Sequence, residues 1–156
     1  MNRRLAIWTC ALGLSVGGAL PARADSHAGR ADAEALVRRV IAYYQANGRD
    51  KTLAAINAHS SAVSDEAHGL YVYVSDVHSG KSLAHGSNAQ MVGVDFSRIR
   101  DTEGKPFVAE LLTLARAGKS GWVDHTRPNP ATKQIENKST YVQAFDGLAF
   151  CAAVSR

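Results

Sequence analysis

The stretch that most constrains the fold covers residues 70–85 and reads LYVYVSDVHSGKSLAH. Its first half alternates aromatic with β-branched residues, so Tyr71 and Tyr73 fall on one face of a strand and the neighbouring valines on the other. Residues 76–80 have the composition of a tight turn, after which the chain returns toward His85. This pattern predicts a β-hairpin whose first strand is apolar on both faces. The alternation leaves open which of the two faces meets a binding site.

The first 24 residues have the pattern of a secretion signal. Two arginines precede an uncharged, mostly apolar run over residues 5–20, and Ala22-Arg23-Ala24 has the small-x-small pattern of a cleavage site. The run is shorter than the ~20 residues that span a bilayer. We therefore expect cleavage near Ala24, a single domain over residues 25–156 without a membrane span, and a periplasmic or secreted location. An uncleaved anchor is the alternative.

Removal of this leader changes what the composition implies. Three of the 18 basic residues and none of the 14 acidic ones lie in it, so the formal net charge falls from +4 to +1. The rest of the chain has no run of Lys or Arg, which gives no case for nucleic-acid binding. Of the 2 cysteines, Cys10 lies in the leader and Cys151 remains alone, so no internal disulfide forms and the core must hold the fold.

Apolar spacing and turn residues predict the remaining elements. Asp32 is the expected N-cap of the first helix. We expect helices over residues 31–47, 50–58 and 106–118, and further strands over residues 121–126, 139–145 and 148–154, with polar connections at 60–68 and 127–137. This order predicts an α+β domain in which a long N-terminal helix packs on an antiparallel sheet, with a further helix between strands.

Motifs of catalysis and metal binding are missing from the sequence. The 6 histidines are scattered, and no HExxH, CxxC or GxSxG pattern occurs. Cys151 lies in an apolar strand, where a buried and inert thiol is expected. We therefore expect that the protein is not an enzyme and that it has no catalytic residue and no cofactor. A metal- or haem-associated protein that uses His85 and His125 is a lesser alternative.

A polar constellation on the predicted strand faces suggests a binding site. It combines cations, ring edges and a phenol: His85, Trp122, Arg127, Lys138 and Tyr141. If these side chains converge, the guanidinium makes a two-pronged contact with an anion, the ammonium adds a point charge, and aromatic walls exclude water. The plainer interpretation is that Lys138 is solvated and Trp122 belongs to the core.

Several motifs together resemble a known family. In order they are GLYVYVSD, LAHGSNAQMVGVDF, DTEGKPFVAELL, GKSGWVDHTRPNP and NKSTYV. They resemble the single Cache domain of type 2, found in extracytoplasmic sensors, over roughly residues 31–156. The resemblance implies a long N-terminal helix on a PAS-like antiparallel sheet that binds a small molecule in a pocket. Family members often form the outer part of chemoreceptors and sensor kinases, where a transmembrane helix follows the domain.

The resemblance also carries over individual positions, and it has departures. The matching residues are Tyr71, His85, Gly93, Asp101, Gly104, Lys105, Gly121, Trp122, Val123, Pro128, Pro130, Lys138, Tyr141 and Val142. The family tends to have Tyr where His125 stands and Trp where Arg127 stands, near the expected ligand. These changes make the region more basic and roomier, which favours an anionic ligand. Residues 150–156 lack the family's Gly-x-Gly-x-Tyr close.

Residues and resemblance together predict a soluble sensory domain that binds a small organic molecule, a carboxylate or another anion. The expected ligand-binding residues are Tyr71, Tyr73, His85, Trp122, His125, Arg127, Lys138 and Tyr141. The sequence ends at Arg156 without a membrane helix or signalling module. We therefore expect the domain to act through a partner, a membrane receptor, sensor kinase or transporter. A ligand-free protein-interaction module is the alternative.

Overall fold

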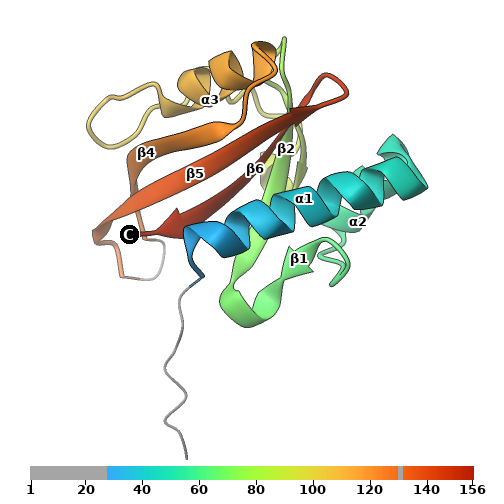
Figure 1. Ribbon diagram of the computed structural model, residues 1–156. Helices are drawn as coiled ribbons and strands as arrows, with labels where there is room; N and C mark the ends of the chain where they lie inside the picture. The colour runs from blue at the N-terminus through green and yellow to red at the C-terminus, as the bar shows by residue number, and fades with distance from the viewer. Residues whose placement is uncertain (1–27, 130–131) are drawn as a thin grey trace, which may run out of the picture.

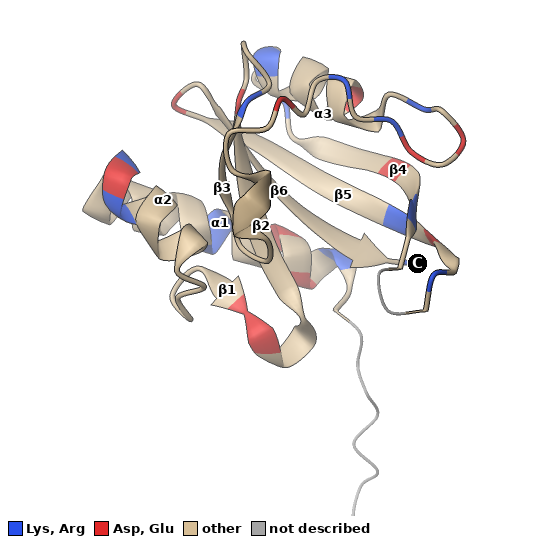
Figure 2. Ribbon diagram, turned by 180° about the vertical axis from the view of Figure 1, so that it is seen from behind, with Lys and Arg blue, Asp and Glu red and all other residues tan. Residues whose placement is uncertain are grey.

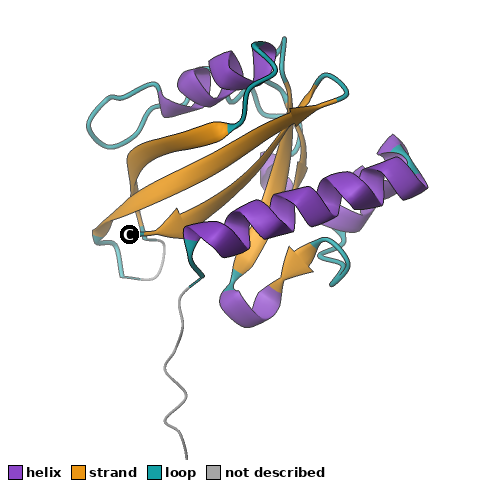
Figure 3. Ribbon diagram, viewed as in Figure 1, coloured by secondary structure: helices purple, strands orange, loops and turns teal. Residues whose placement is uncertain are grey.

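An antiparallel sheet with helices on both faces organises the chain (Figures 1 and 3). The computed structural model describes residues 28–129 and 132–156, so the expected signal peptide lies outside the described residues. The elements are α1 (Arg30–Asn47), α2 (Arg49–Asn57), β1 (Ser64–Asp65), the 3₁₀ turn η1 (Glu66–His68), β2 (Leu70–Asp76), β3 (Ser82–His85), the 3₁₀ turn η2 (Ala89–Met91), α3 (Phe107–Arg116), β4 (Gly121–Pro128), β5 (Ile135–Phe145) and β6 (Leu148–Ser155). The predicted α+β class is confirmed.

The last strand of the chain lies inside the sheet. Its strand order is β1-β2-β6-β5-β4, and β3 pairs with β2. All pairings are antiparallel, and the last strand, β6, lies between β2 and β5. The predicted hairpin at residues 76–80 joins β2 to β3. The Asp146–Gly147 turn joins β5 to β6, and both of its residues have positive φ angles (50° and 72°), as a two-residue hairpin of type I′ requires.

Both faces of β2 are covered, as its composition predicts. Val72 and Val74 are fully buried in the cluster beneath α1, together with residues of α2. Tyr73 lies in a second cluster on the other face, with Phe96 and the apolar side of α3. The structure thereby decides what alternation left open: the tyrosines of β2 face α3, and the valines face α1.

Helix α1 packs by the predicted stripe but begins differently. The buried residues Leu36, Val37, Val40, Ile41 and Tyr44 recur at helical spacing. The prediction that Asp32 is the N-cap is wrong, because the helix begins after Gly29. Asp32 is instead the third helical residue, and its carboxylate accepts a hydrogen bond from the Gly29 amide at 2.8 Å.

Strands β4 and β5 are longer than predicted. The connection expected at residues 127–137 is partly a β-ladder, in which Arg127 pairs with Glu136 and Pro128 with Ile135. Pairing with a neighbouring strand provides hydrogen bonds that the polar composition of this stretch does not indicate. The ladder places Arg127 on a strand instead of a loop.

Residues 86–106 form a long loop, here called the strap, that crosses the α3 side of the sheet. At its start the amide of Gly86 donates to the Val72 carbonyl, and a Cβ at Gly86 would lie only 2.9 Å from that oxygen. Near its end, the Asp101 carboxylate accepts hydrogen bonds from the amides of Glu103 and Lys105 and from the Thr126 amide of β4. The strap is therefore fixed to the sheet at both ends.

Within the described residues, the helices are too short or too polar to cross a membrane.

A hydrogen bond ties the end of α1 to the β5–β6 turn, and its removal should weaken the fold. The Tyr44 phenol donates to Asp146, and burial, with that carboxylate, raises the pKa of the phenol. We expect Tyr44→Phe to lower the free energy of unfolding by about 1–2 kcal/mol in urea titrations. Tyr43→Phe is the matched control, since no hydrogen bond of its phenol occurs within the described residues, and its effect should stay within about 0.5 kcal/mol. Equal effects of both variants would contradict this role of Tyr44.

Candidate ligand-binding site

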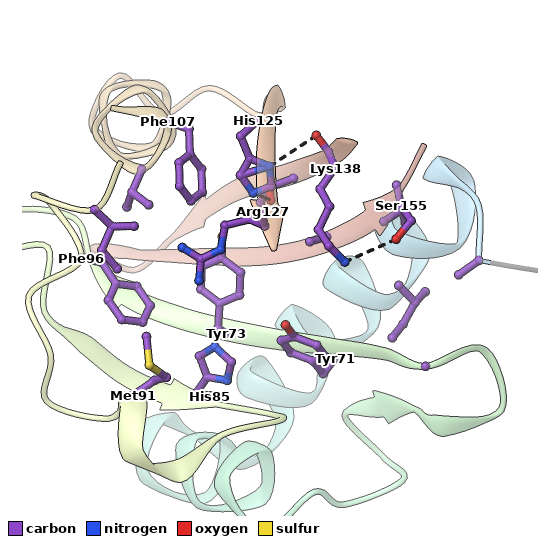
Figure 4. A pocket seen from close by; sticks show the side chains of 18 of the residues that line it. Tyr71, Tyr73, His85, Met91, Phe96, Phe107, His125, Arg127, Lys138 and Ser155 are labelled. Atoms are coloured by element: carbon purple, nitrogen blue, oxygen red, sulfur yellow. Dashed lines mark hydrogen bonds between the residues drawn. The ribbon is translucent and has the colours of Figure 1, made fainter. Parts of the chain in front are cut away.

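A cavity of about 290 Å³ lies on the α3 face of the sheet, beneath the strap (Figure 4). Strands β2, β4, β5 and β6 form its floor, and the strap and the start of α3 form its walls. The lining residues are Ala28, His68, Gly69, Leu70, Tyr71, Tyr73, His85, Met91, Phe96, Ile99, Phe107, Val108, His125, Arg127, Pro128, Lys138, Thr140, Ala153, Val154 and Ser155. No Asp or Glu occurs among the described residues that line it.

Six of the eight predicted site residues line this one cavity. They come from four strands: Tyr71, Tyr73, His85, His125, Arg127 and Lys138. The side-chain period of two explains the grouping, because the two tyrosines are two residues apart on β2, and His125 and Arg127 are two apart on β4. The structure therefore brings together residues that lie up to 67 positions apart in sequence.

Trp122 and Tyr141, the other two predicted site residues, do not line this cavity. Both lie on the opposite face of the sheet, with ring centroids 5.3 Å apart. The Trp122 indole donates to the Glu34 carboxylate of α1 at 2.9 Å, and the Arg30 guanidinium lies over its ring. The reason is alternation: Trp122 is three residues from His125, an odd number, so the two side chains point to opposite faces.

Several lining residues escaped the sequence interpretation. Phe107 and Val108 stand at the start of the predicted apolar face of a helix, where nothing distinguishes a cavity wall from ordinary core. Met91 and Phe96 lie in the strap, whose Gly- and Ser-containing sequence gives no signal of burial. Thr140 is two residues from Lys138 on β5, so the period of two placed it on the same face.

His85 is held as a neutral ring. Its Nδ1 accepts hydrogen bonds from the amides of Asn88 (3.2 Å) and Ser87 (3.4 Å), so the ring proton is on Nε2. Its own amide donates to Asn57 of α2, and its ring stacks on Tyr73 with centroids 5.6 Å apart. Burial, with the charges of His59 and Arg127, lowers the pKa of His85 to about 4. His85 thus offers a neutral N–H donor.

His125 is also neutral, with the opposite tautomer. Its Nδ1 lies 3.3 Å from the Lys138 carbonyl oxygen, which only accepts, so the proton is on Nδ1 and Nε2 receives the Thr140 hydroxyl at 3.4 Å. The Phe107 ring packs against it with centroids 4.0 Å apart. Burial, and next the charge of Arg127, lowers the pKa of His125 to about 4. Burial also raises the pKa of Tyr73 well above its usual value, so this phenol is uncharged.

Arg127 is the cation of the cavity without a counter-charge. Neither a hydrogen bond nor an ion pair of its guanidinium occurs in the described part of the chain. Lys138 and His68 of the lining have partners. The Lys138 ammonium lies 3.3 Å from the Ser155 hydroxyl oxygen and 3.5 Å from a Glu136 carboxylate oxygen, and His68 Nδ1 lies 2.9 Å from an Asp65 carboxylate oxygen. In Figure 2 the basic positions on β4 and β5 lie close to the C-terminal end.

This arrangement suits an organic anion. A guanidinium presents a planar pair of donors that matches both oxygens of a carboxylate. Neutral donors around it add hydrogen bonds, and they do so without the cost of burying a second charged side chain. A metal ion fits less well, because the described residues contain no group of three His, Cys, Asp or Glu side chains that could hold one.

Comparison with known proteins gives a family and one curated relative. The family model of single Cache domain 2 matches residues 24–150. The methyl-accepting chemotaxis protein McpP of Pseudomonas putida is 30% identical over 111 residues, which cover 68% of this chain and 20% of that protein. The chain therefore spans about a fifth of the length of this relative.

Two solved structures share the fold. One, described as the periplasmic sensor domain of a chemotaxis protein, has 24% identity and a TM-score of 0.57, and the match covers 79% of this chain and 85% of that one. The other, described as the structural basis for carboxylic acid recognition by a Cache chemosensory domain, has 20% identity and a TM-score of 0.63, and covers 80% and 91%. At these identities the likeness shows the fold alone, that of PAS-like sensor domains.

The two neutral histidines should make the protein less stable in mild acid. In the unfolded chain each ring takes up a proton near pH 6.5, whereas in the folded protein it does so only near pH 4. Each therefore contributes stability that is complete above pH 6.5 and is lost as the pH falls toward 4, on the order of 3 kcal/mol at most. Urea unfolding across this range measures the loss. His68 acts in the opposite direction, because its hydrogen bond to Asp65 raises its pKa.

The matched control is the double variant His85→Asn, His125→Asn. The asparagine amides do not titrate. They can replace the hydrogen bonds that the Nδ1 atoms of the two histidines make, accepting at position 85 and donating at position 125. We expect its stability to change much less than that of the wild type between pH 4 and 6.5. Profiles of equal slope would show that these rings do not cause the acid sensitivity.

Proposed function

Because the chain belongs to the single Cache domain 2 family, whose members are extracytoplasmic sensor domains, we propose that it senses a small carboxylate bound in the cavity on the α3 face. The single observation that carries this proposal is Arg127. Its guanidinium lines the cavity, no carboxylate neutralises it in the described part of the chain, and no acidic side chain there shares the lining.

The proposed ligand binds with its carboxylate toward Arg127. The Nε2 hydrogen of His85 and the phenol of Tyr71 would supply further neutral donors in the lining. Phe96 and Phe107 form an apolar side that suits a short hydrocarbon part (Figure 4). The volume of about 290 Å³ is at the lower end of small-molecule pockets, which favours an acid of a few carbon atoms.

Location and partner are part of the same proposal. We place the domain outside the cytoplasm, after removal of residues 1–24, and we propose that its signal passes to a membrane receptor, a sensor kinase or a transporter. Support comes from the family and from the chemotaxis protein that matches over a fifth of its length. A module that works only through its surface would have no need of the cavity, and for this reason we favour ligand binding.

Titration calorimetry with straight-chain monocarboxylates of two to six carbons tests the proposal. We expect at least one of these acids to bind, and to raise the free energy of unfolding by about 2.7 kcal/mol at a hundredfold excess over its dissociation constant. Arg127→Gln removes the charge that meets the carboxylate and should weaken binding about a hundredfold or more. Lys119→Gln is the control, because Lys119 is exposed and outside the cavity lining.

Two results would refute the proposal. One is that no acid of the panel binds. The other is that the Arg127→Gln variant binds as tightly as the Lys119→Gln variant.

A further inference from the structure

Glu136 lies directly across the β-ladder from Arg127 but does not pair with it. Antiparallel pairing of β4 with β5 sets the two residues opposite each other, and such pairs have Cβ atoms about 5 Å apart on the same face. The Glu136 carboxylate instead accepts a hydrogen bond from the Asn129 amide at 2.5 Å and lies 3.5 Å from the Lys138 ammonium. It does not line the cavity itself.

The position of Glu136 beside Lys138 limits how many positive charges in the cavity are available to a ligand. Lys138 lines the cavity, but its ammonium lies 3.5 Å from the Glu136 carboxylate. It also lies 3.3 Å from the Ser155 hydroxyl oxygen, as Figure 4 shows. The side chains of Lys138 and Glu136 are 29% and 31% exposed, so water screens their attraction only in part. Arg127 is thus the lining cation that forms no ion pair with an acidic side chain within the described residues, although Glu136 is its neighbour across the ladder.

Among the described lining residues, a second negative charge on a ligand would meet no further cation without an acidic partner. It would have to displace Glu136 from Lys138, and it would stand near the Glu136 carboxylate itself. Like charges brought together without a counter-charge are a strong means of rejecting a wrong ligand.

We propose that Glu136 is a positioning residue that sets the charge specificity of the cavity. By holding Lys138 it limits the site to ligands with one negative charge and rejects dianions. This inference rests on the proposed function, since it specifies which carboxylates the same cavity accepts.

The test compares acids of equal chain length that differ by one carboxylate. Butyrate and succinate form one such pair, and propionate and malonate another, measured by calorimetry at pH 7.5. In the wild type the monocarboxylate of each pair should bind about tenfold more tightly or better than the dicarboxylate.

Glu136→Gln keeps an oxygen for the Asn129 amide and removes the charge that holds Lys138. We expect the dicarboxylate to gain about tenfold in affinity while the monocarboxylate changes less than about threefold. The double variant Glu136→Gln, Lys138→Met should lose this gain. Lys138→Met alone leaves the Glu136 carboxylate without the ammonium and should increase the preference for the monocarboxylate. A purely structural role of Glu136 would change both affinities in proportion, so the ratio is the decisive readout.

The outcomes separate the two proposals. If neither these monocarboxylates nor any other acid of the panel binds, the proposed function fails and this inference with it. If a monocarboxylate binds and its dicarboxylate binds equally well, only the inference is overturned. A Glu136→Gln variant whose ratio matches the wild type overturns it as well. Should that variant fail to fold, an unchanged ratio in the Lys138→Met variant has the same meaning.

Discussion

The structure depends on the burial of β2 from both sides. Val72 and Val74 pack against α1 with no exposed surface, while Tyr73 on the other face is 9% exposed beneath the strap. Burial on this scale is the main favourable term in folding, and it requires a layer on each face of the sheet. The layer beneath α1 is a buried apolar cluster. The layer beneath α3 and the strap holds a second buried cluster and also the cavity, so the proposed binding site lies on only one face of the sheet.

Within the cavity, burial keeps both histidines neutral. His85 and His125 lose their charges because the ionised ring would be poorly solvated there and because Arg127 is close. Among the described lining residues, the guanidinium of Arg127 is therefore a cation without an ion pair beside neutral donors, and a guanidinium stays protonated in proteins. A low-dielectric surrounding strengthens the attraction of such a cation for an anion, while neutral neighbours add no repulsion of their own.

Periodicity predicted the fold from the sequence to a large extent. The stripe of α1, the alternation of β2 and the Asp146–Gly147 turn all reflect local geometry that the residues themselves encode. The spacing along β4 also predicts that Trp122 faces away from His125 and Arg127, because it is an odd number of residues from both. The sequence gives no local signal for the strand pairing of Arg127 with Glu136 or for the place of Met91 and Phe96 in the cavity wall, because both depend on contacts between different elements.

The anchoring of the strap has a consequence for how the domain behaves among other copies. Strand β4 is at the edge of the sheet, where unpaired backbone groups invite another strand to add itself. The Lys105 ammonium donates to the Asp124 carbonyl at 2.7 Å, and the Asp101 carboxylate receives the Thr126 amide at 3.2 Å, so side chains of the strap occupy two of these groups. The strap thus covers the cavity and also occupies part of the edge of the sheet. Detachment of the strap would expose the cavity and the edge of β4 together, and the exposed edge would favour aggregation.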